Sequence, residues 1–397
     1  MRPQGVVDDE LLDAVRSSVL AEPGPVTPAR IAAAVQASGR LLGTAGTLAA
    51  IDAIAAELRG LGPLQGLAND PHVTDIFVNG PGDVWVDRGR GLERASGASF
   101  PTEDAVRALA VRLVAVGGRR LDDSSPCVDV RLPGGYRVHA VLPPVSITGT
   151  LLSVRISRER TLTLDELEAA GTVLPAQREV LEALVVQRRS FLVSGATGAG
   201  KTTLLSTLLG LVPGDERVVL VEDAAELVPA HGHTVTLEAR HGNVEGAGRV
   251  DLAELVRQAL RMRPDWLVVG ECRGAEVREL LAALNTGHSG AGTIHANAAE
   301  SVVARLTALG ALAGLTPEAT ALQAASALEA VVHLERTPAG RRVASIAVVG
   351  EGRGRLAIRD ALVREGDGGS GACRQGPGWA DLASMLGLGL RRLGAVA

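Results

Sequence analysis

Residues 195–203 carry the pattern with the clearest chemistry in this sequence. Gly195, Gly200, Lys201 and Thr202 have the spacing G-x-x-x-x-G-K-[ST], after an apolar run and before a helical pattern. In such a loop the glycines let backbone amides turn toward phosphate groups, the lysine neutralises the outer phosphates, and the hydroxyl can bind Mg²⁺. The pattern predicts binding of MgATP by nine residues: Gly195, Ala196, Thr197, Gly198, Ala199, Gly200, Lys201, Thr202 and Thr203.

Lysine use singles out the same loop. The chain has 40 basic residues, of which 39 are arginine and one, Lys201, is lysine. A planar guanidinium cannot replace a compact ammonium in a tight phosphate loop. A glycine-rich loop with a chance lysine is therefore disfavoured as an explanation of this segment.

A carboxylate follows an apolar run that has the character of a buried strand. The run 266–269 leads into Gly270 and Glu271, and open α/β sheets place their sites at the carboxyl ends of strands. We expect Glu271 to polarise the attacking water, although a solvated turn residue would give the same sequence. Asp265, which precedes the strand, is poorly placed for this role.

An acidic group follows the apolar run 217–221. Glu222, Asp223 and Glu226 offer the oxygen ligands that hydrated Mg²⁺ prefers. Either Glu222 or Asp223 could hold the ion through water, with Thr202 as a direct ligand, and Glu222 is also a candidate catalytic residue. Helix caps and surface carboxylates produce the same pattern, so both explanations stay open.

Two histidines enclose the glycine-rich segment TGHSGAGTIHAN, which follows an amphipathic helical pattern over 277–284. His288 and His295, beside a flexible loop that returns toward the sheet, are candidates to sense the γ-phosphate. The alternative is a packed or capping role for each.

Six arginines are further candidates: Arg131, Arg137 and Arg155 in an earlier part of the chain, and Arg261, Arg263 and Arg273 around the strand that ends at Glu271. Phosphoryl-transfer sites commonly take an arginine from another domain or subunit. The earlier three are of interest for that reason, although most of the 39 arginines must be ordinary solvated residues.

The elements that must position these residues fall into two predicted domains, and the two ends of the chain are predicted to be less regular. Short alternating strands at 75–79 and 84–88, then a helix around 104–116, indicate an α+β domain. Helices and apolar strands alternate later, after a capping box at Thr163 and Glu166, as in a parallel sheet. The predicted parts are a helical front segment (1–60), an α+β domain (61–158), an α/β nucleotide domain (159–350) and a flexible tail rich in glycine and arginine (351–397).

Composition limits the partners and the compartment. A net charge of -5, a pI near 6.0 and 2% aromatic residues disfavour nucleic acid as a partner. Three scattered cysteines indicate neither a disulfide framework nor a zinc site. Acidic residues in the first fifteen positions are atypical of a signal peptide, and the uncharged stretch 280–299 is too polar for a membrane span. We expect a cytoplasmic protein.

The motifs together resemble the TadA/CpaF group of tight-adherence pilus ATPases, within the type II and type IV secretion ATPase superfamily. The resemblance runs from about Gly62 to His333 and includes GPLQGLANDPHVTDIFVNGPGDVWVDR, GATGAGKTTLL, EDAAEL, RQALRMRPDWLVVGECRGAEV and LNTGHSGAGTIHAN. It implies a Walker A loop over 195–203, an Asp box over 222–226, a Walker B strand over 265–271 and a His box over 287–295.

The resemblance also implies an architecture and partners. A RecA-like P-loop domain would follow a smaller PAS-like α+β domain that supplies Arg131, Arg137 or Arg155, and the chain would assemble as a hexamer. The ring would lie at the inner face of the cell membrane and act on polytopic platform proteins. The missing tetracysteine zinc module favours the tight-adherence branch. The departures at Gly134, where the family usually has an aspartate, and at Ala196 and Cys272 remove none of the charged candidates named above.

Three functions follow from these patterns. The first is an ATPase that powers pilus assembly or protein secretion. The second is an ATP-binding scaffold with negligible hydrolysis, which Lys201, Glu271 and His295 argue against. The third is a conjugation-type translocation ATPase, which the acidic balance and scarce aromatic residues disfavour.

Overall fold

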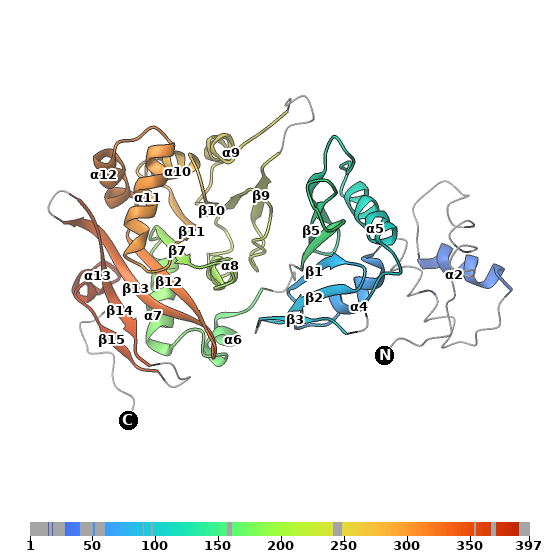
Figure 1. Ribbon diagram of the computed structural model, residues 1–397. Helices are drawn as coiled ribbons and strands as arrows, with labels where there is room; N and C mark the ends of the chain where they lie inside the picture. Colours follow the sequence, from blue (N-terminus) through green and yellow to red (C-terminus); the bar gives the residue numbers. More distant parts are fainter. Residues whose placement is uncertain are drawn as a thin grey trace. The chain divides into compact units, whose positions relative to one another are not determined.

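The computed structural model describes residues 15, 18, 28–39, 51, 60–89, 91–96, 98–156, 161–240, 248–352, 355–366 and 371–388. The chain forms two compact units, Met1–Glu159 and Arg160–Ala397 (Figure 1). In the front segment the structure describes one helix, α2 (Pro28–Ala37). Most of the predicted helical segment 1–60 lies outside the described residues.

The first unit is built on an antiparallel sheet with the strand order β3-β2-β1-β6-β5-β4. Alternate residues of β2 and β4 are buried, which explains the alternating sequence pattern. The helix predicted around 104–116 is confirmed, and its first turn is capped by the Thr102 hydroxyl, which accepts from the Ala105 amide. The elements are η1 (Gly62–Leu64), α4 (Gln65–Ala68), β1 (Asp75–Gly80), β2 (Asp83–Asp87), β3 (Leu92–Arg94), α5 (Glu103–Val116), β4 (Cys127–Leu132), β5 (Tyr136–Val141) and β6 (Leu151–Ile156).

The second unit contains a nine-stranded sheet with the order β15-β14-β13-β12-β7-β11-β10-β8-β9. The six strands from β12 to β9 are parallel and the last three of the chain are antiparallel. The strands of this unit are β7 (Phe191–Gly195), β8 (Val218–Glu222), β9 (Thr234–Glu238), β10 (Trp266–Cys272), β11 (Ser289–His295), β12 (Ala330–Thr337), β13 (Gly340–Gly352), β14 (Arg355–Arg364) and β15 (Cys373–Gln375). Its helices are α6 (Leu164–Ala169), α7 (Pro175–Val186), α8 (Lys201–Leu209), α9 (Leu252–Ala259), η2 (Leu260–Met262), α10 (Glu276–Leu284), α11 (Ser301–Leu312), α12 (Pro317–Ala327) and α13 (Trp379–Met385).

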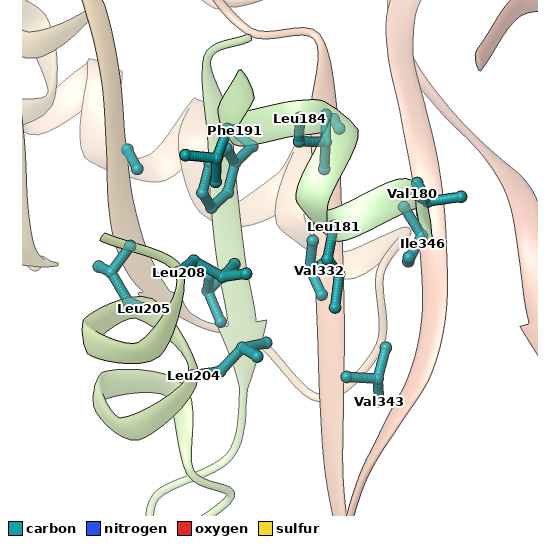
Figure 2. Packing of buried hydrophobic residues seen from close by; sticks show 14 of the residues in the cluster. Val180, Leu181, Leu184, Phe191, Leu204, Leu205, Leu208, Val332, Val343 and Ile346 are labelled. Carbon is teal, nitrogen blue, oxygen red and sulfur yellow. The ribbon is translucent and has the colours of Figure 1, made fainter. Parts of the chain in front are cut away.

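Helices α7 and α8 pack on the strand that leads into the glycine-rich loop. Strand β7 is buried along its whole length, as expected for a parallel strand covered on both faces. Figure 2 shows Leu184 of α7 and Leu204 and Leu208 of α8 in one cluster with Phe191. The Phe191 ring also meets Trp266 of β10 edge to face, with 6.4 Å between ring centroids. This core fixes the strand, the loop and the helix as one body.

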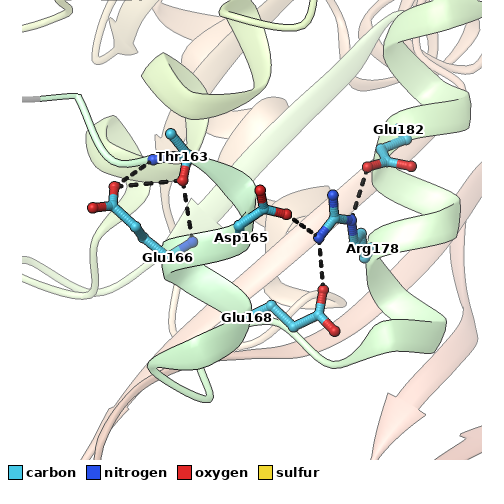
Figure 3. A network of polar contacts seen from close by, with 6 residues as sticks. All are labelled: Thr163, Asp165, Glu166, Glu168, Arg178 and Glu182. Atoms are coloured by element: carbon cyan, nitrogen blue, oxygen red, sulfur yellow. Dashed lines mark hydrogen bonds and ion pairs between the residues drawn. The ribbon is translucent and has the colours of Figure 1, made fainter.

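A polar network joins the first two helices of the second unit (Figure 3). The capping box predicted at Thr163 is confirmed, because its hydroxyl accepts from the Glu166 amide and the Glu166 carboxylate accepts from the Thr163 amide. On α7, Arg178 pairs with three carboxylates: Asp165, Glu168 and Glu182. The network therefore links α6 to α7 through pairs that solvent screens, and such surface pairs contribute little to stability.

The prediction of a flexible tail from residue 351 is wrong for the residues that the structure describes there. Strand β14 pairs with β13 along its length, and Leu362 and Trp379 are buried in the same core as β7. The glycine and arginine content had hidden an alternating apolar pattern in Leu356 and Ile358, whose side chains pack on the other face of the sheet. The sheet that carries the glycine-rich loop thus includes this part of the chain.

Among the described residues, no helix combines the length and the apolar character that crossing a membrane requires.

Candidate nucleotide-binding site

Four neighbouring parallel strands bring predicted site residues to one edge of the large sheet. Strand β7 ends at Gly195, β11 at His295, β10 just after Glu271, and β8 at Glu222. In the strand pairing Gly195 lies opposite His295 on one side and opposite Leu334 of β12 on the other. The carboxyl edge of a parallel sheet is where such folds bind ligands, and residues far apart in the sequence converge there.

The loop after β7 has the backbone conformation of an anion-binding nest. Gly195, Gly198 and Gly200 have φ values of 152°, 74° and 98°, which favour glycine. A Cβ atom on Gly195 would lie 2.5 Å from the Leu334 carbonyl oxygen, so no side chain fits there. Helix α8 starts at Lys201 without a side-chain cap, so its first amides and dipole face the loop. This arrangement fits the phosphate groups of ATP.

Lys201 is buried against the loop that precedes it. Its Nζ donates to the carbonyl oxygens of Gly195 and Ala196, at 3.0 Å each. Burial lowers the pKa of Lys201, and the negative charge of Glu271 acts in the opposite direction. The ammonium therefore lies within electrostatic range of the predicted catalytic carboxylate, and Thr202 follows it at the start of the helix.

Glu271 shares the edge with a mixed set of charges. Its carboxylate forms an ion pair with Arg273. The pKa of Arg273 is raised first by this hydrogen bond and further by the charges of Asp223 and Glu226. Lys201 and Asp223 therefore both lie within electrostatic range of Arg273, although the described residues include no group of three or more histidine, cysteine or acidic side chains placed to hold a metal ion.

Glu222 occupies a different position from the rest of the acidic group. It is buried, and its Oε1 accepts from the amides of Glu226 and Leu227 at 2.9 and 3.0 Å. These bonds hold the turn that presents Asp223. Glu222 thus has an anchoring role in this structure, and a catalytic or metal-binding role for it stays a prediction.

The two predicted histidines do not lie together. His295 is at the carboxyl end of β11, beside Gly195, whereas His288 precedes the other end of the same strand. The six residues between them span about 20 Å of strand. His288 bonds to Thr286 and to the Ala283 carbonyl, which fits the packed or capping alternative for this residue, and a phosphate-sensing role for His295 stays a prediction.

Arg261 and Arg263 are also remote from the loop. They lie just before β10, at the amino edge of the sheet, and Arg261 bonds to Gln258. Of the three arginines predicted around this strand, the structure places only Arg273 near Lys201.

The first unit holds its three predicted arginines in one row. Arg131 of β4 lies opposite Arg137 of β5, and Arg137 lies opposite Arg155 of β6. Like charges at directly opposed positions are unfavourable. Asp75, on the next strand, compensates in part by pairing with Arg155 at 3.2 Å. Such a row of arginines is suited to binding an anion.

A hairpin that sequence reasoning did not consider contacts the glycine-rich loop. The tip of β12 and β13 pairs Arg336 with Arg341, and Arg341 Nε donates to the Gly198 carbonyl at 2.9 Å. A Cβ atom on Gly198 would lie 3.5 Å from Arg336 Nη1. The sequence signal was the pair of arginines on either side of a two-residue turn, but nothing in the sequence alone shows which loop such a hairpin touches.

We expect Arg341→Ala to weaken nucleotide binding about 3- to 10-fold, because one hydrogen bond that holds the loop contributes about 0.5–1.5 kcal/mol. Titration of a fluorescent ATP analogue measures the dissociation constant. Arg355→Ala is the matched control, since Arg355 pairs with Gly352 at the opposite end of β13. Equal losses in both variants would show that the hairpin contact has no specific role.

Comparisons with known proteins are consistent with this geometry. The family described as "Type II/IV secretion system protein" matches residues 57–369. A putative conjugal transfer protein of Mycobacterium tuberculosis strain H37Rv is 52% identical over 324 residues, which cover 80% of this chain and 92% of that protein. The conjugal transfer protein TrbB of Rhizobium radiobacter is 33% identical over 288 residues, or 70% and 84% of the two chains.

Among solved structures, the Legionella pneumophila ATPase DotB matches 72% of this chain and 79% of its own, with a TM-score of 0.52 and 20% identity. At that identity the match shows the fold alone, and it confirms the predicted α/β fold class.

Proposed function

The chain belongs to the type II/IV secretion system protein family, and from that premise we propose that it hydrolyses MgATP to drive a secretion or pilus-assembly apparatus. The observation that carries the proposal is the convergence at one sheet edge of a glycine nest, the buried ammonium of Lys201 and the carboxylate of Glu271. A protein that only bound nucleotide would need the nest, but would not need the carboxylate beside it.

Each residue of the edge has a distinct part in the proposed reaction. The amides of residues 196–200 and the start of α8 bind the phosphates, and Lys201 balances their charge. Thr202 and Asp223 would hold Mg²⁺, which supplies additional positive charge at the phosphate oxygens. Glu271 accepts hydrogen bonds from the attacking water and orients it, and His295 detects the terminal phosphate from the neighbouring strand.

Arginines from the first unit complete the proposed site. Arg131, Arg137 and Arg155 form a row that is suited to stabilising the charge that develops on the transferring phosphoryl group. We propose that one of them acts on the site of a neighbouring copy in a homohexamer. Activity then depends on assembly, because a lone copy lacks this cation.

The proposed partners are polytopic proteins of a membrane platform. The ring would lie at the cytoplasmic face of the membrane and pass on the movements of its nucleotide cycle. A tight-adherence pilus is the system that the sequence motifs favour.

A conjugation apparatus is the second candidate, because the relatives at 52% and 33% identity are named conjugal transfer proteins. The net charge of -5 disfavours direct contact with DNA. Hydrolysis that single-stranded DNA stimulates, and that salt suppresses steeply, would favour this second candidate.

The proposal is tested by measuring MgATP hydrolysis against protein concentration, with the oligomer size recorded in the same samples. We expect the turnover per chain to rise as rings form. Binding of ATP without turnover in assembled rings would instead indicate a scaffold, or a motor that requires its membrane partner.

A further inference from the structure

A buried histidine that the proposed reaction does not use lies directly behind the glycine-rich loop. His333, on β12, is 3% exposed, and its Nδ1 lies 2.9 Å from the hydroxyl of Ser194 on β7. Ser194 is fully buried and immediately precedes Gly195, the first glycine of the loop. The imidazole is therefore bonded to the base of the loop.

The other side of the same ring faces the segment that follows His295. The imidazole lies against the main chain at Asn297, and its Nε2 makes no hydrogen bond of good geometry with any described residue. A neutral imidazole has one donor and one acceptor nitrogen. With its proton on Nε2, the ring accepts from the Ser194 hydroxyl through Nδ1.

The surroundings favour the neutral ring. Burial lowers the pKa of His333, while carboxylates on three elements act in the opposite direction: Glu335 on β12, Glu300 before α11 and Asp360 on β14. Burial likewise raises the pKa of Asp360, which bonds to Ser345, the β13 residue opposite His333. The imidazole of His333 can therefore stay neutral beside the carboxylates of Glu335, Glu300 and Asp360.

We propose that His333 is a positioning residue: through its bond to Ser194 it holds the strand that begins the phosphate-binding loop, with its ring beside the segment that follows His295, and so sets the spacing between the loop and His295. It acts in its neutral form and touches neither nucleotide nor water. The inference rests on the proposed ATPase function, since it assigns a role within that same site.

Two substitutions separate positioning from simple packing. Glutamine keeps a donor and an acceptor but does not titrate, whereas leucine has a similar volume and no polar atom. We expect His333→Leu to lower kcat about tenfold while the dissociation constant for a fluorescent ATP analogue stays within about threefold, because the spacing matters most in the transition state. We expect His333→Gln to keep most of the activity at pH 7.5.

The pH profile supplies a readout that packing alone would not change. Because burial lowers the pKa of His333, kcat of the wild type should fall only at a pH below the ordinary histidine range, as His333 takes up a proton, and His333→Gln should lose that acid limb. His233→Gln is the matched control, because His233 is exposed and bonds to Arg217. If His333→Leu hydrolyses ATP like the wild type, or if the Gln and wild-type profiles superimpose, the inference is wrong.

Stability of the nucleotide-free protein gives a test that does not depend on hydrolysis. Because the folded pKa of His333 lies below its ordinary value, the unfolded chain takes up the proton first. Neutral His333 therefore contributes its full stabilisation of the folded protein above pH 6.5, and this contribution is lost as the pH falls below that value. The urea midpoint of the wild type should therefore fall more between pH 7 and pH 5 than that of His333→Gln.

The two proposals fail in different ways. If wild type and the His233→Gln control both bind no ATP, the proposed function fails; if they bind ATP without turnover, the urea series alone tests the role of His333. If both hydrolyse ATP and the His333 variants match them in every measurement, only the positioning role fails. Should His333→Leu not fold, the glutamine variant decides.

Discussion

Replacement of Lys201 by alanine is expected to lower kcat/KM for MgATP at least about 100-fold, which corresponds to about 3 kcal/mol of lost transition-state stabilisation. Lys201 supplies a buried positive charge at the start of α8, with its Nζ held at the loop carbonyls. Alanine removes the charge and keeps the helix start. Steady-state hydrolysis and titration of a labelled ATP analogue measure the two parts of the loss.

Lys201→Arg is the informative companion to this variant. It preserves the charge, but the guanidinium is larger and planar, and the Lys201 side chain is buried. We expect Lys201→Arg to be almost as inactive as Lys201→Ala. Hydrolysis at the wild-type rate by the arginine variant would mean that charge alone matters and that the shape of the loop does not.

Glu271→Gln is expected to leave ATP binding within about threefold of the wild type and to lower turnover by about 10²–10⁴. Glutamine has the shape of the carboxylate and can still accept from Arg273, but it cannot draw a proton from water. Single-turnover hydrolysis in assembled rings separates the chemical step from binding.

The control for this variant is Glu279→Gln on α10, a carboxylate that pairs with Arg257 away from the loop. It should keep full turnover. Normal turnover in Glu271→Gln would show that another group at the same sheet edge orients the attacking water, and Asp223 would be the next candidate.

The sequence was sufficient to predict those parts of the structure that depend on local patterns. The spacing of Gly195, Gly200 and Lys201 defines a loop whose backbone conformation the structure reproduces. The capping box at Thr163 and the amphipathic helix α5 were predictable for the same reason, since the interacting residues are three or four positions apart.

Features that depend on distant pairing could not be predicted in this way. His288 and His295 are close in sequence, yet a strand separates them, and the period of a strand does not reveal which end meets the loop. Arg341 and His333 reach the loop through the pairing of β12 with β7, more than a hundred residues earlier in the chain. In the tail, the many glycines and arginines obscured the few apolar residues of β14, so the strand and its pairing with β13 were not predicted.

The position of β7 within its sheet has a consequence for biosynthesis. Both of its neighbours, β11 and β12, come later in the chain, so the strand has no sheet to join when it leaves the ribosome. Between Gly195 and the end of β12 at Thr337 a ribosome adds about 140 residues, which takes roughly 10 to 30 s at ordinary elongation rates. During that interval the apolar strand Phe191–Gly195 is a natural client for a chaperone that binds nascent chains, and nucleotide cannot assist folding until translation is nearly complete.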